Sequence, residues 1–133
     1  PRSTRFPYTT LFRSYGEDFN ILPGEAYFVI SLSQGVFLYS GNMVENSLEI
    51  YLRTGWNLVN IYNSLKPSYT GFNLLQQMKN ASLEATTLSK WEDGRYTSIV
   101  DSDGNQYGYD FNVYPTRGYF IKIENGEGKF SPE

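Results

Sequence analysis

The chain has 133 residues, enough for one domain of ordinary size with a hydrophobic core. It contains no cysteine and no histidine. These absences exclude disulfide scaffolds, thiolate zinc sites, cysteine nucleophiles, histidine-ligated metals and Ser-His-Asp triads. Aromatic residues make up 17% of the chain and charged residues 19%, with a formal net charge of −3. The composition therefore limits the class of protein, but it does not identify a ligand.

The first fourteen residues, PRSTRFPYTTLFRS, differ in character from the rest of the chain. They carry three arginines and no acid, and they have no hydrophobic period. The string resembles the translated read-through of a sequencing-library adapter at the end of an assembled environmental DNA fragment, with RFPYTTLFRS as its specific part. We therefore expect residues 1–14 to be non-native and exclude them from fold reasoning; the alternative is a native basic arm. Without them, 8 basic residues stand against 14 acidic ones, a net charge of −6 that argues against nucleic acid as a partner.

An internal repeat follows this segment. Residues 15–29 read YGEDFNILPGEAYFV and residues 107–121 read YGYDFNVYPTRGYFI, 92 positions later without a gap. With one inserted residue the match continues from 35–37 to 128–130. The repeat predicts tandem modules of about 90 residues, with 15–42 as the C-terminal hairpin of a preceding copy and 43–133 as one nearly complete module. The alternative is one domain with two similar hairpins. The identical pairs are Tyr15/Tyr107, Gly16/Gly108, Asp18/Asp110, Phe19/Phe111, Asn20/Asn112, Pro23/Pro115, Tyr27/Tyr119 and Phe28/Phe120.

Strands separated by short polar turns dominate the remaining pattern. Runs rich in Tyr, Phe, Val, Ile and Thr alternate with turns at Asp93-Gly94, Asp103-Gly104 and Asn125-Gly126, which are typical of hairpins. The fold class predicted is mainly β, an antiparallel sandwich or small barrel built as a hairpin meander. The strands expected are Ala26–Leu32, Gly35–Tyr39, Ser47–Leu52, Trp56–Tyr62, Ala85–Trp91, Arg95–Asp101, Tyr107–Val113, Tyr119–Glu124 and Gly128–Ser131.

One short α-helix is expected at residues 71–80, GFNLLQQMKN. Phe72, Leu75 and Met78 recur at helical spacing with Leu74 beside them, which gives a single apolar stripe. Thr70 is the predicted N-cap, because its hydroxyl can accept a hydrogen bond from an amide of the first turn. We expect the stripe to cover one face or end of the sheet; the alternative is a groove for a partner.

Four segments in this order resemble a repeated module of large secreted and cell-surface bacterial proteins. They are GWNLV at 55–59, the helix with Leu74-Leu75, TTLSKWEDGRYTSIV at 86–100 and DFNVYPTRGYFI at 110–121. Ala26 in the first copy and Thr116-Arg117 in the second depart from the pattern. The resemblance implies a secreted or cell-surface location and no defined catalytic activity. It implies an adhesive, accessory or spacer role beside other domains.

Two sets of residues are candidate ligand sites. Exposed aromatic rings on a sheet can stack on sugar rings, and this predicts a carbohydrate site; the alternative is core packing. Oxygen-bearing side chains at alternate positions predict a calcium site; the alternative is a polar turn, since Gly104 does not fall where an EF-hand loop needs it. We place Trp56 in the core. The carbohydrate candidates are Trp91, Tyr96, Tyr107 and Tyr109, and the calcium candidates are Asp101, Asp103, Asn105 and Asp110.

No pair of carboxylates indicates catalysis. A glycosidase needs two carboxyl groups across a cleft, whereas Glu92 and Asp93 are adjacent on a turn. We therefore expect a non-catalytic module that has no cofactor other than a candidate calcium ion; the alternative is a glycoside-active enzyme fragment. The partners expected are a polysaccharide or neighbouring domains of the same polypeptide, with no nucleic acid and no membrane insertion. Residues 15–42 are expected to pack against the module or to pair between molecules, because their sheet would leave an open edge.

Overall fold

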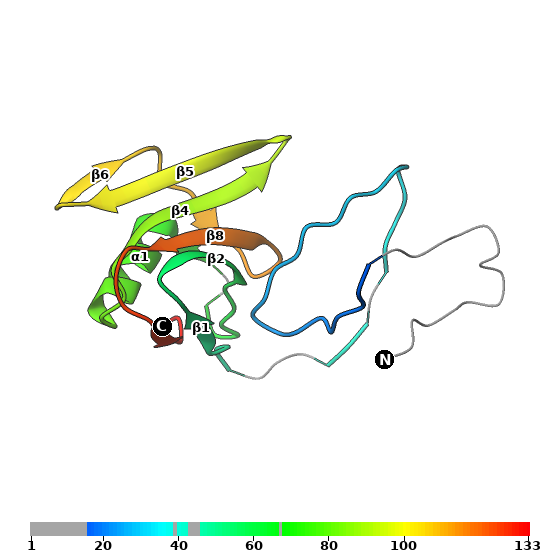
Figure 1. Cartoon of the computed structure of the whole chain (residues 1–133), viewed down its shortest axis with the longest axis horizontal. Helices are drawn as coiled ribbons and strands as arrows, with labels where there is room; N and C mark the ends of the chain where they lie inside the picture. Colours follow the sequence, from blue (N-terminus) through cyan, green and yellow to red (C-terminus); the bar gives the residue numbers. More distant parts are fainter. Residues whose placement is uncertain (1–15, 39, 43–45, 67) are drawn as a thin grey trace.

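The computed structural model describes residues 16–38, 40–42, 46–66 and 68–133 (Figure 1). The segment 1–14 and the residues Tyr39 and Pro67 lie outside the described residues. The prediction of a mainly β fold with one short helix is confirmed, and the sheets stay open instead of closing into a barrel. The elements are β1 (Ile50–Leu52), β2 (Gly55–Asn60), β3 (Tyr69–Thr70), α1 (Gly71–Asn80), β4 (Ala85–Glu92), β5 (Arg95–Ser102), β6 (Asn105–Tyr107), β7 (Asn112–Val113), β8 (Gly118–Ile123) and β9 (Gly128–Phe130).

Strand β8 lies inside a five-stranded antiparallel sheet of order β2-β8-β4-β5-β6. Two smaller sheets pair β1 with β9 and β3 with β7. Each of the three sheets therefore contains one strand from the C-terminal segment 112–130, paired with strands that lie earlier in the chain. This segment ties the sheets together, so its loss removes a strand from all three.

The turns of the β4–β5 and β5–β6 hairpins follow the predicted Asp-Gly pattern. Asp93 and Gly94 have φ of 53° and 75°, and Asp103 and Gly104 have φ of 52° and 77°. Positive φ at both central residues matches the right-handed twist of the flanking strands, and Asp-Gly tolerates it well. The first of these turns sets the register that aligns Trp91 with Tyr96 across the β4–β5 hairpin.

Helix α1 spans Gly71–Asn80, as predicted, but its N-terminus is capped by a distant residue. Thr70 occupies the N-cap position without a side-chain capping hydrogen bond, so that part of the prediction is wrong. Instead, the backbone N–H of Phe72 donates to Asp110 Oδ1 at 3.1 Å, and that of Gly71 donates to the carbonyl of Phe111 at 2.9 Å. The capping residue belongs to the chain segment between β6 and β7. Local sequence spacing does not show that this segment lies at the end of α1.

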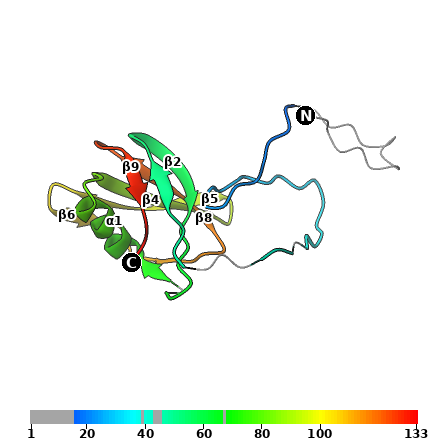
Figure 2. The same cartoon turned by 90° about the horizontal axis from the view of Figure 1, so that it is seen from below.

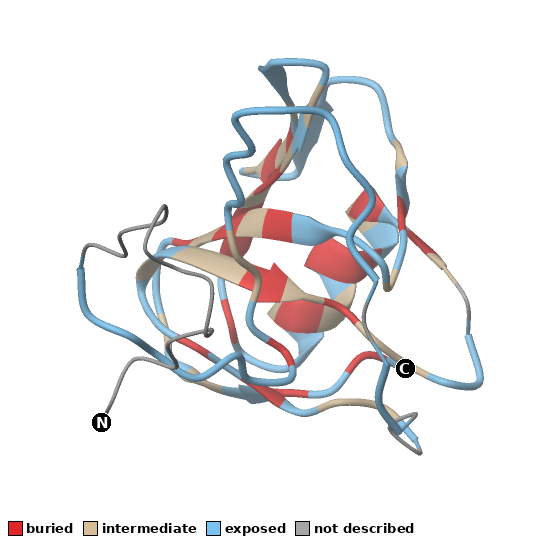
Figure 3. Ribbon diagram, turned by 90° about the vertical axis from the view of Figure 1, so that its right-hand side faces the viewer, coloured by how far each residue is buried: buried red, intermediate tan, exposed pale blue. Residues whose placement is uncertain are grey.

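The core lies between one face of the five-stranded sheet and α1. Leu88, Ile99 and Ile121 align across β4, β5 and β8 and are buried. Leu74, Leu75 and Met78 of α1 belong to the same buried cluster, which confirms that the apolar stripe is core. Figure 3 shows the buried residues concentrated where the helix meets the strands. The remaining members of the cluster are Ile50, Leu52, Val59, Ile61, Tyr69, Leu83, Ala85, Val113, Tyr119, Ile123 and Phe130.

The first copy of the repeat forms no strand within 16–38, contrary to the prediction for 26–32 and 35–38. Within the described residues, its one β-bridge joins Glu25 to Val59 at the free edge of β2. Residues 29–38 are exposed, and this part of the chain loops away from the sheets (Figures 1 and 2). The predicted strand 107–113 is also divided, because Gly108 has φ of 93° and the chain then turns towards α1.

Candidate ligand-binding face

Helix α1 packs on one face of the five-stranded sheet, and within the described residues no helix covers the opposite face (Figure 1). That opposite face carries large, exposed aromatic side chains. Side chains alternate between the two faces of a strand, and Ile121 and Val59 point into the core. Phe120 and Trp56 therefore point away from it. We call this side the outer face; it also carries Ser89, Trp91, Tyr96, Ser98, Val100 and Lys122, as the strand registers require.

A hollow of about 360 Å³ lies on the outer face, lined by Trp56, Ser89, Tyr96, Ser98 and Phe120. We call it the aromatic trough. The Trp56 and Phe120 ring centroids are 6.5 Å apart at 84°, and those of Tyr96 and Phe120 are 5.7 Å apart at 73°. Both rings are therefore nearly perpendicular to the Phe120 ring, and the strand order places Phe120 between them. The hydroxyl oxygens of the two serines are 2.7 Å apart and give the trough a polar strip.

A second hollow of about 450 Å³ adjoins the trough at Phe120. Its lining includes Phe28 and Trp91 as well as Lys90, Glu92 and Arg117, and we call it the charged hollow. The Phe28 ring lies 5.6 Å from that of Phe120 and 6.3 Å from that of Trp91. Trp91 also contacts Tyr96 at 4.6 Å, so a continuous row of rings joins the two hollows.

Glu92 is held between two cations at the rim of the charged hollow. Its carboxylate is 2.7 Å from Lys90 Nζ and also forms an ion pair with Arg117. Hydrogen bonds from Lys90 and then from Arg117 lower the pKa of Glu92 to about 2. The carboxyl group is therefore ionised at neutral pH and has no proton to donate as a general acid. The arrangement places fixed donors and acceptors beside exposed rings.

The structure brings two of the four predicted carbohydrate residues together. Trp91 and Tyr96 are in contact on the outer face. Tyr107 aligns with Val100, so it belongs to the same face, but it lies on the edge strand β6 and outside the trough lining. Tyr109 is 94% exposed and follows β6.

The prediction that Trp56 belongs to the core is wrong, because its side chain is 57% exposed. The position of Trp56 along β2 could have indicated that its side chain lies on the outer face. Trp56 lies three residues before the buried Val59, so the two must occupy opposite faces of β2. Sequence reasoning also missed the remaining trough residues, Ser89, Ser98 and Phe120, since their alignment depends on which strands are neighbours.

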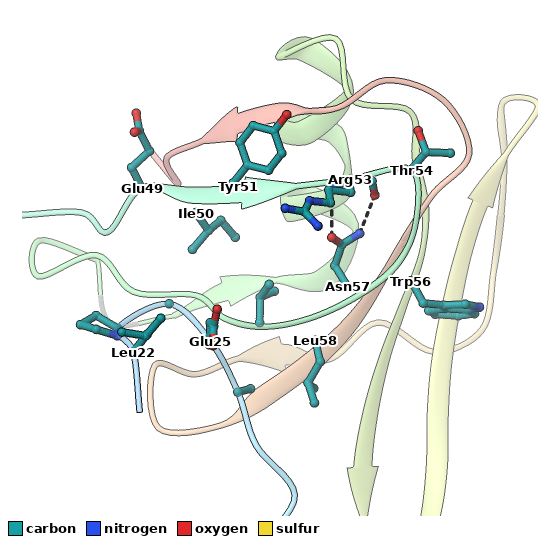
Figure 4. Close-up of a pocket in the computed structure, with 14 residues that line it drawn as sticks. Leu22, Glu25, Glu49, Ile50, Tyr51, Arg53, Thr54, Trp56, Asn57 and Leu58 are labelled. Carbon is teal, nitrogen blue, oxygen red and sulfur yellow. Dashed lines mark hydrogen bonds between the residues drawn. The ribbon is translucent and has the colours of Figure 1, made fainter. Parts of the chain in front are cut away.

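A third hollow, of about 580 Å³, lies where residues 22–26 meet β1 and β2 (Figure 4). Arg53 and Asn57 are joined across its wall by two hydrogen bonds, from the Arg53 N–H to Asn57 Oδ1 at 3.0 Å and from Asn57 Nδ2 to the Arg53 carbonyl at 2.8 Å. Trp56 also lines this hollow, and in Figure 4 its ring lies on the side away from Leu22 and Glu25. Of the nearby acids, Glu49 forms an ion pair with Lys129 at 2.7 Å.

The four predicted calcium ligands do not converge. Asp101 is buried, where its carboxylate forms an ion pair with Lys79 and accepts a hydrogen bond from Gln106. Asp110 caps α1. Asp103 and Asn105 lie on the exposed β5–β6 turn, where the Asn105 amide donates to the Asp103 carbonyl at 3.2 Å. Within the described residues, no group of three or more Asp or Glu side chains is placed to hold a metal ion.

Comparison of the chain with models of known protein families, with curated proteins and with solved structures finds no match in any of the three. None of the helices in the described part of the chain is long and apolar enough to cross a membrane.

Proposed function

We propose that this chain is a non-catalytic, carbohydrate-binding module from a tandem array in a secreted or surface-attached protein. The observation that carries the proposal is the aromatic trough on the uncovered outer face. The exposed rings of Trp56 and Tyr96 line this trough and offer apolar surface on which the C–H face of a pyranose can stack. Ser89 and Ser98 in the trough, and Glu92 and Arg117 in the charged hollow, supply hydrogen-bonding groups for sugar hydroxyls. Ligand sites commonly combine apolar walls with a few such groups.

The two copies of the repeat support the tandem arrangement through matching local contacts. Asp18 Oδ1 accepts from the Phe19 N–H at 3.0 Å, as Asp110 Oδ1 does from that of Phe111 at 2.9 Å. The Tyr27 hydroxyl accepts from the Leu22 N–H at 2.9 Å, and that of Tyr119 accepts from Tyr114 at the same distance. The rings of Phe19 and Tyr27 stack at 13°, and those of Phe111 and Tyr119 at 12°. The repeated sequence thus specifies a repeated local structure.

A passive spacer between other domains is the alternative function. It is favoured by the position of Phe28, whose ring packs on Trp91 and Phe120 and covers part of the outer face. If the outer face serves only as a packing surface for the preceding copy of the repeat, its rings are buried in the tandem array and no glycan binds there.

The experiment that separates these functions is binding of the full chain to a panel of soluble and insoluble polysaccharides, by affinity electrophoresis and sedimentation. Carbohydrate binding predicts retention on at least one polymer, weakened at least tenfold by Trp56→Ala and by Tyr96→Ala. Tyr51→Ala is the matched control, since Tyr51 is a half-exposed ring on β1 in a different sheet. No retention on any polymer, or equal weakening by all three variants, would favour the spacer.

A further inference from the structure

Residues 16–37 repeat the sequence of the C-terminal segment that supplies one strand to each of the three sheets. They form no sheet of their own. In the second copy, β7 pairs with β3, β8 lies between β2 and β4, and β9 pairs with β1. Every partner strand comes from residues 50–92. The segment from β7 to β9 therefore completes a framework that the preceding part of the module builds.

Two core positions of that segment keep apolar residues in the first copy. Val113 and Ile121 are 1% and 0% exposed, and at an offset of 92 they correspond to Ile21 and Val29. Ile21 is 71% exposed and Val29 is 87% exposed. Two apolar side chains that fill the core in one copy are thus in solvent in the other, where removing them from water would be favourable. The first copy departs from this pattern at Ser31, which stands where the second copy has the buried Ile123.

We propose that residues 18–37 are a strand donor that completes the sheets of a second copy of the unit formed by residues 46–107. Val29 would occupy the place of Ile121 between the equivalents of β2 and β4, and Ile21 the place of Val113. Adding a strand to an open sheet satisfies backbone hydrogen bonds and specifies alternate side chains together. The proposal rests on the tandem arrangement proposed above, in which the receiving copy precedes residue 16 in the same polypeptide.

Fusion of an extra copy of residues 46–107 directly before residue 16 of residues 16–133 tests the proposal. The junction joins Tyr107 to Gly16, which reproduces the native Tyr107-Gly108 step and keeps the register of the repeat. The proposal predicts that the fusion holds two folded modules. Hydrogen exchange should show protected amides in the added copy and in residues 26–31, and chymotrypsin should cut after Leu32 much more slowly than in residues 16–133 alone.

Two variants of the fusion separate strand donation from other causes of order. Val29→Asp places a charge at a core position, so the added copy should lose its protection while the original module keeps it. Ile30→Lys is the matched control, because Ile30 corresponds to Lys122 on the outer face, and it should leave both copies folded. A fusion in which residues 26–31 are replaced by GYFIKI, the β8 sequence, checks that the design can fold.

Folding of the GYFIKI fusion without folding of the unmodified one would overturn the proposal. Equal effects of Val29→Asp and Ile30→Lys would also overturn it. So would a result in which the chain 16–133, without the added copy, protects the amides of residues 26–31 increasingly as its concentration rises, because that indicates pairing between molecules. None of these results depends on glycan binding. Failure to bind a polysaccharide and failure to donate a strand are therefore distinguishable.

Discussion

The helix cap supplied by Asp110 gives the sharpest stability prediction. In Asp110→Ala, the carboxylate oxygen that accepts from the Phe72 N–H at 3.1 Å and from the Phe111 N–H at 2.9 Å is lost. Loss of an N-cap costs typically about 1 kcal/mol, and the second orphaned amide takes the expected cost to roughly 1–2 kcal/mol. For a module of about 90 residues this corresponds to a fall in Tm of roughly 5–15 °C.

Thermal unfolding followed by far-ultraviolet circular dichroism measures this effect. Asp110→Asn keeps a side-chain oxygen and should cost less, losing mainly the favourable charge at the helix N-terminus, about 0.3–1 kcal/mol. Thr70→Ala should change the free energy of unfolding by less than about 0.5 kcal/mol, because the Thr70 hydroxyl makes no capping bond. A larger loss in Thr70→Ala than in Asp110→Ala would refute the reasoning and restore the local cap.

Further predictions concern the core, the buried ion pair and calcium. Gly71→Ala should lower Tm although alanine favours helices, because its Cβ would lie 2.5 Å from Ile99 Cδ1; an unchanged or higher Tm would show that the core yields freely. Lys79→Met should destabilise the fold by roughly 1–3 kcal/mol at pH 7 in urea unfolding, since it leaves the Asp101 carboxylate buried with fewer donors. The hydrogen bond from Lys79 lowers the pKa of Asp101 below its unfolded value. The stabilisation is therefore complete above about pH 4 and is lost as the pH falls through the folded-state pKa. A difference in urea midpoint between wild type and Lys79→Met that stays constant from pH 6 to pH 2 would contradict this reasoning. Calcium and chelator should give the same Tm, because the oxygens of Asp101 and Asp110 are engaged on the helix side of the sheet.

The parts of the fold that sequence predicted well are those set by neighbours in the chain. The stripe of Leu75 and Met78 located α1 within its observed bounds, and the Asp-Gly pairs located two hairpin turns. Thr70 shows the limit of this approach. A local capping residue was present, but Asp110, 38 residues beyond Phe72, supplies the bond because the chain between β6 and β7 crosses the end of the helix.

The candidate site was only half predictable for the same physical reason. Trp91 and Tyr96 face each other across one hairpin, whose turn fixes their pairing. Trp56 and Phe120 reach the trough only because β2 and β4 both flank β8, an order of strands that local patterns do not determine. The first copy of the repeat was predicted as strands from its sequence, and strands need partners. Within the described residues it has one bridge, at Glu25.

The proposed glycan site can be tested directly because the chain has only two tryptophans and both lie on the outer face. The measurement is a titration of the full chain with the polysaccharide retained most strongly in the panel, followed through the indole N–H signals in two-dimensional NMR. Binding at the aromatic trough predicts that the Trp56 signal shifts and saturates. The Trp91 signal should shift with it because the Trp91 ring contacts Tyr96 of the trough, while the backbone amide of Tyr51 on β1 should not move. Saturable binding that leaves both indole signals unchanged would contradict the proposed site.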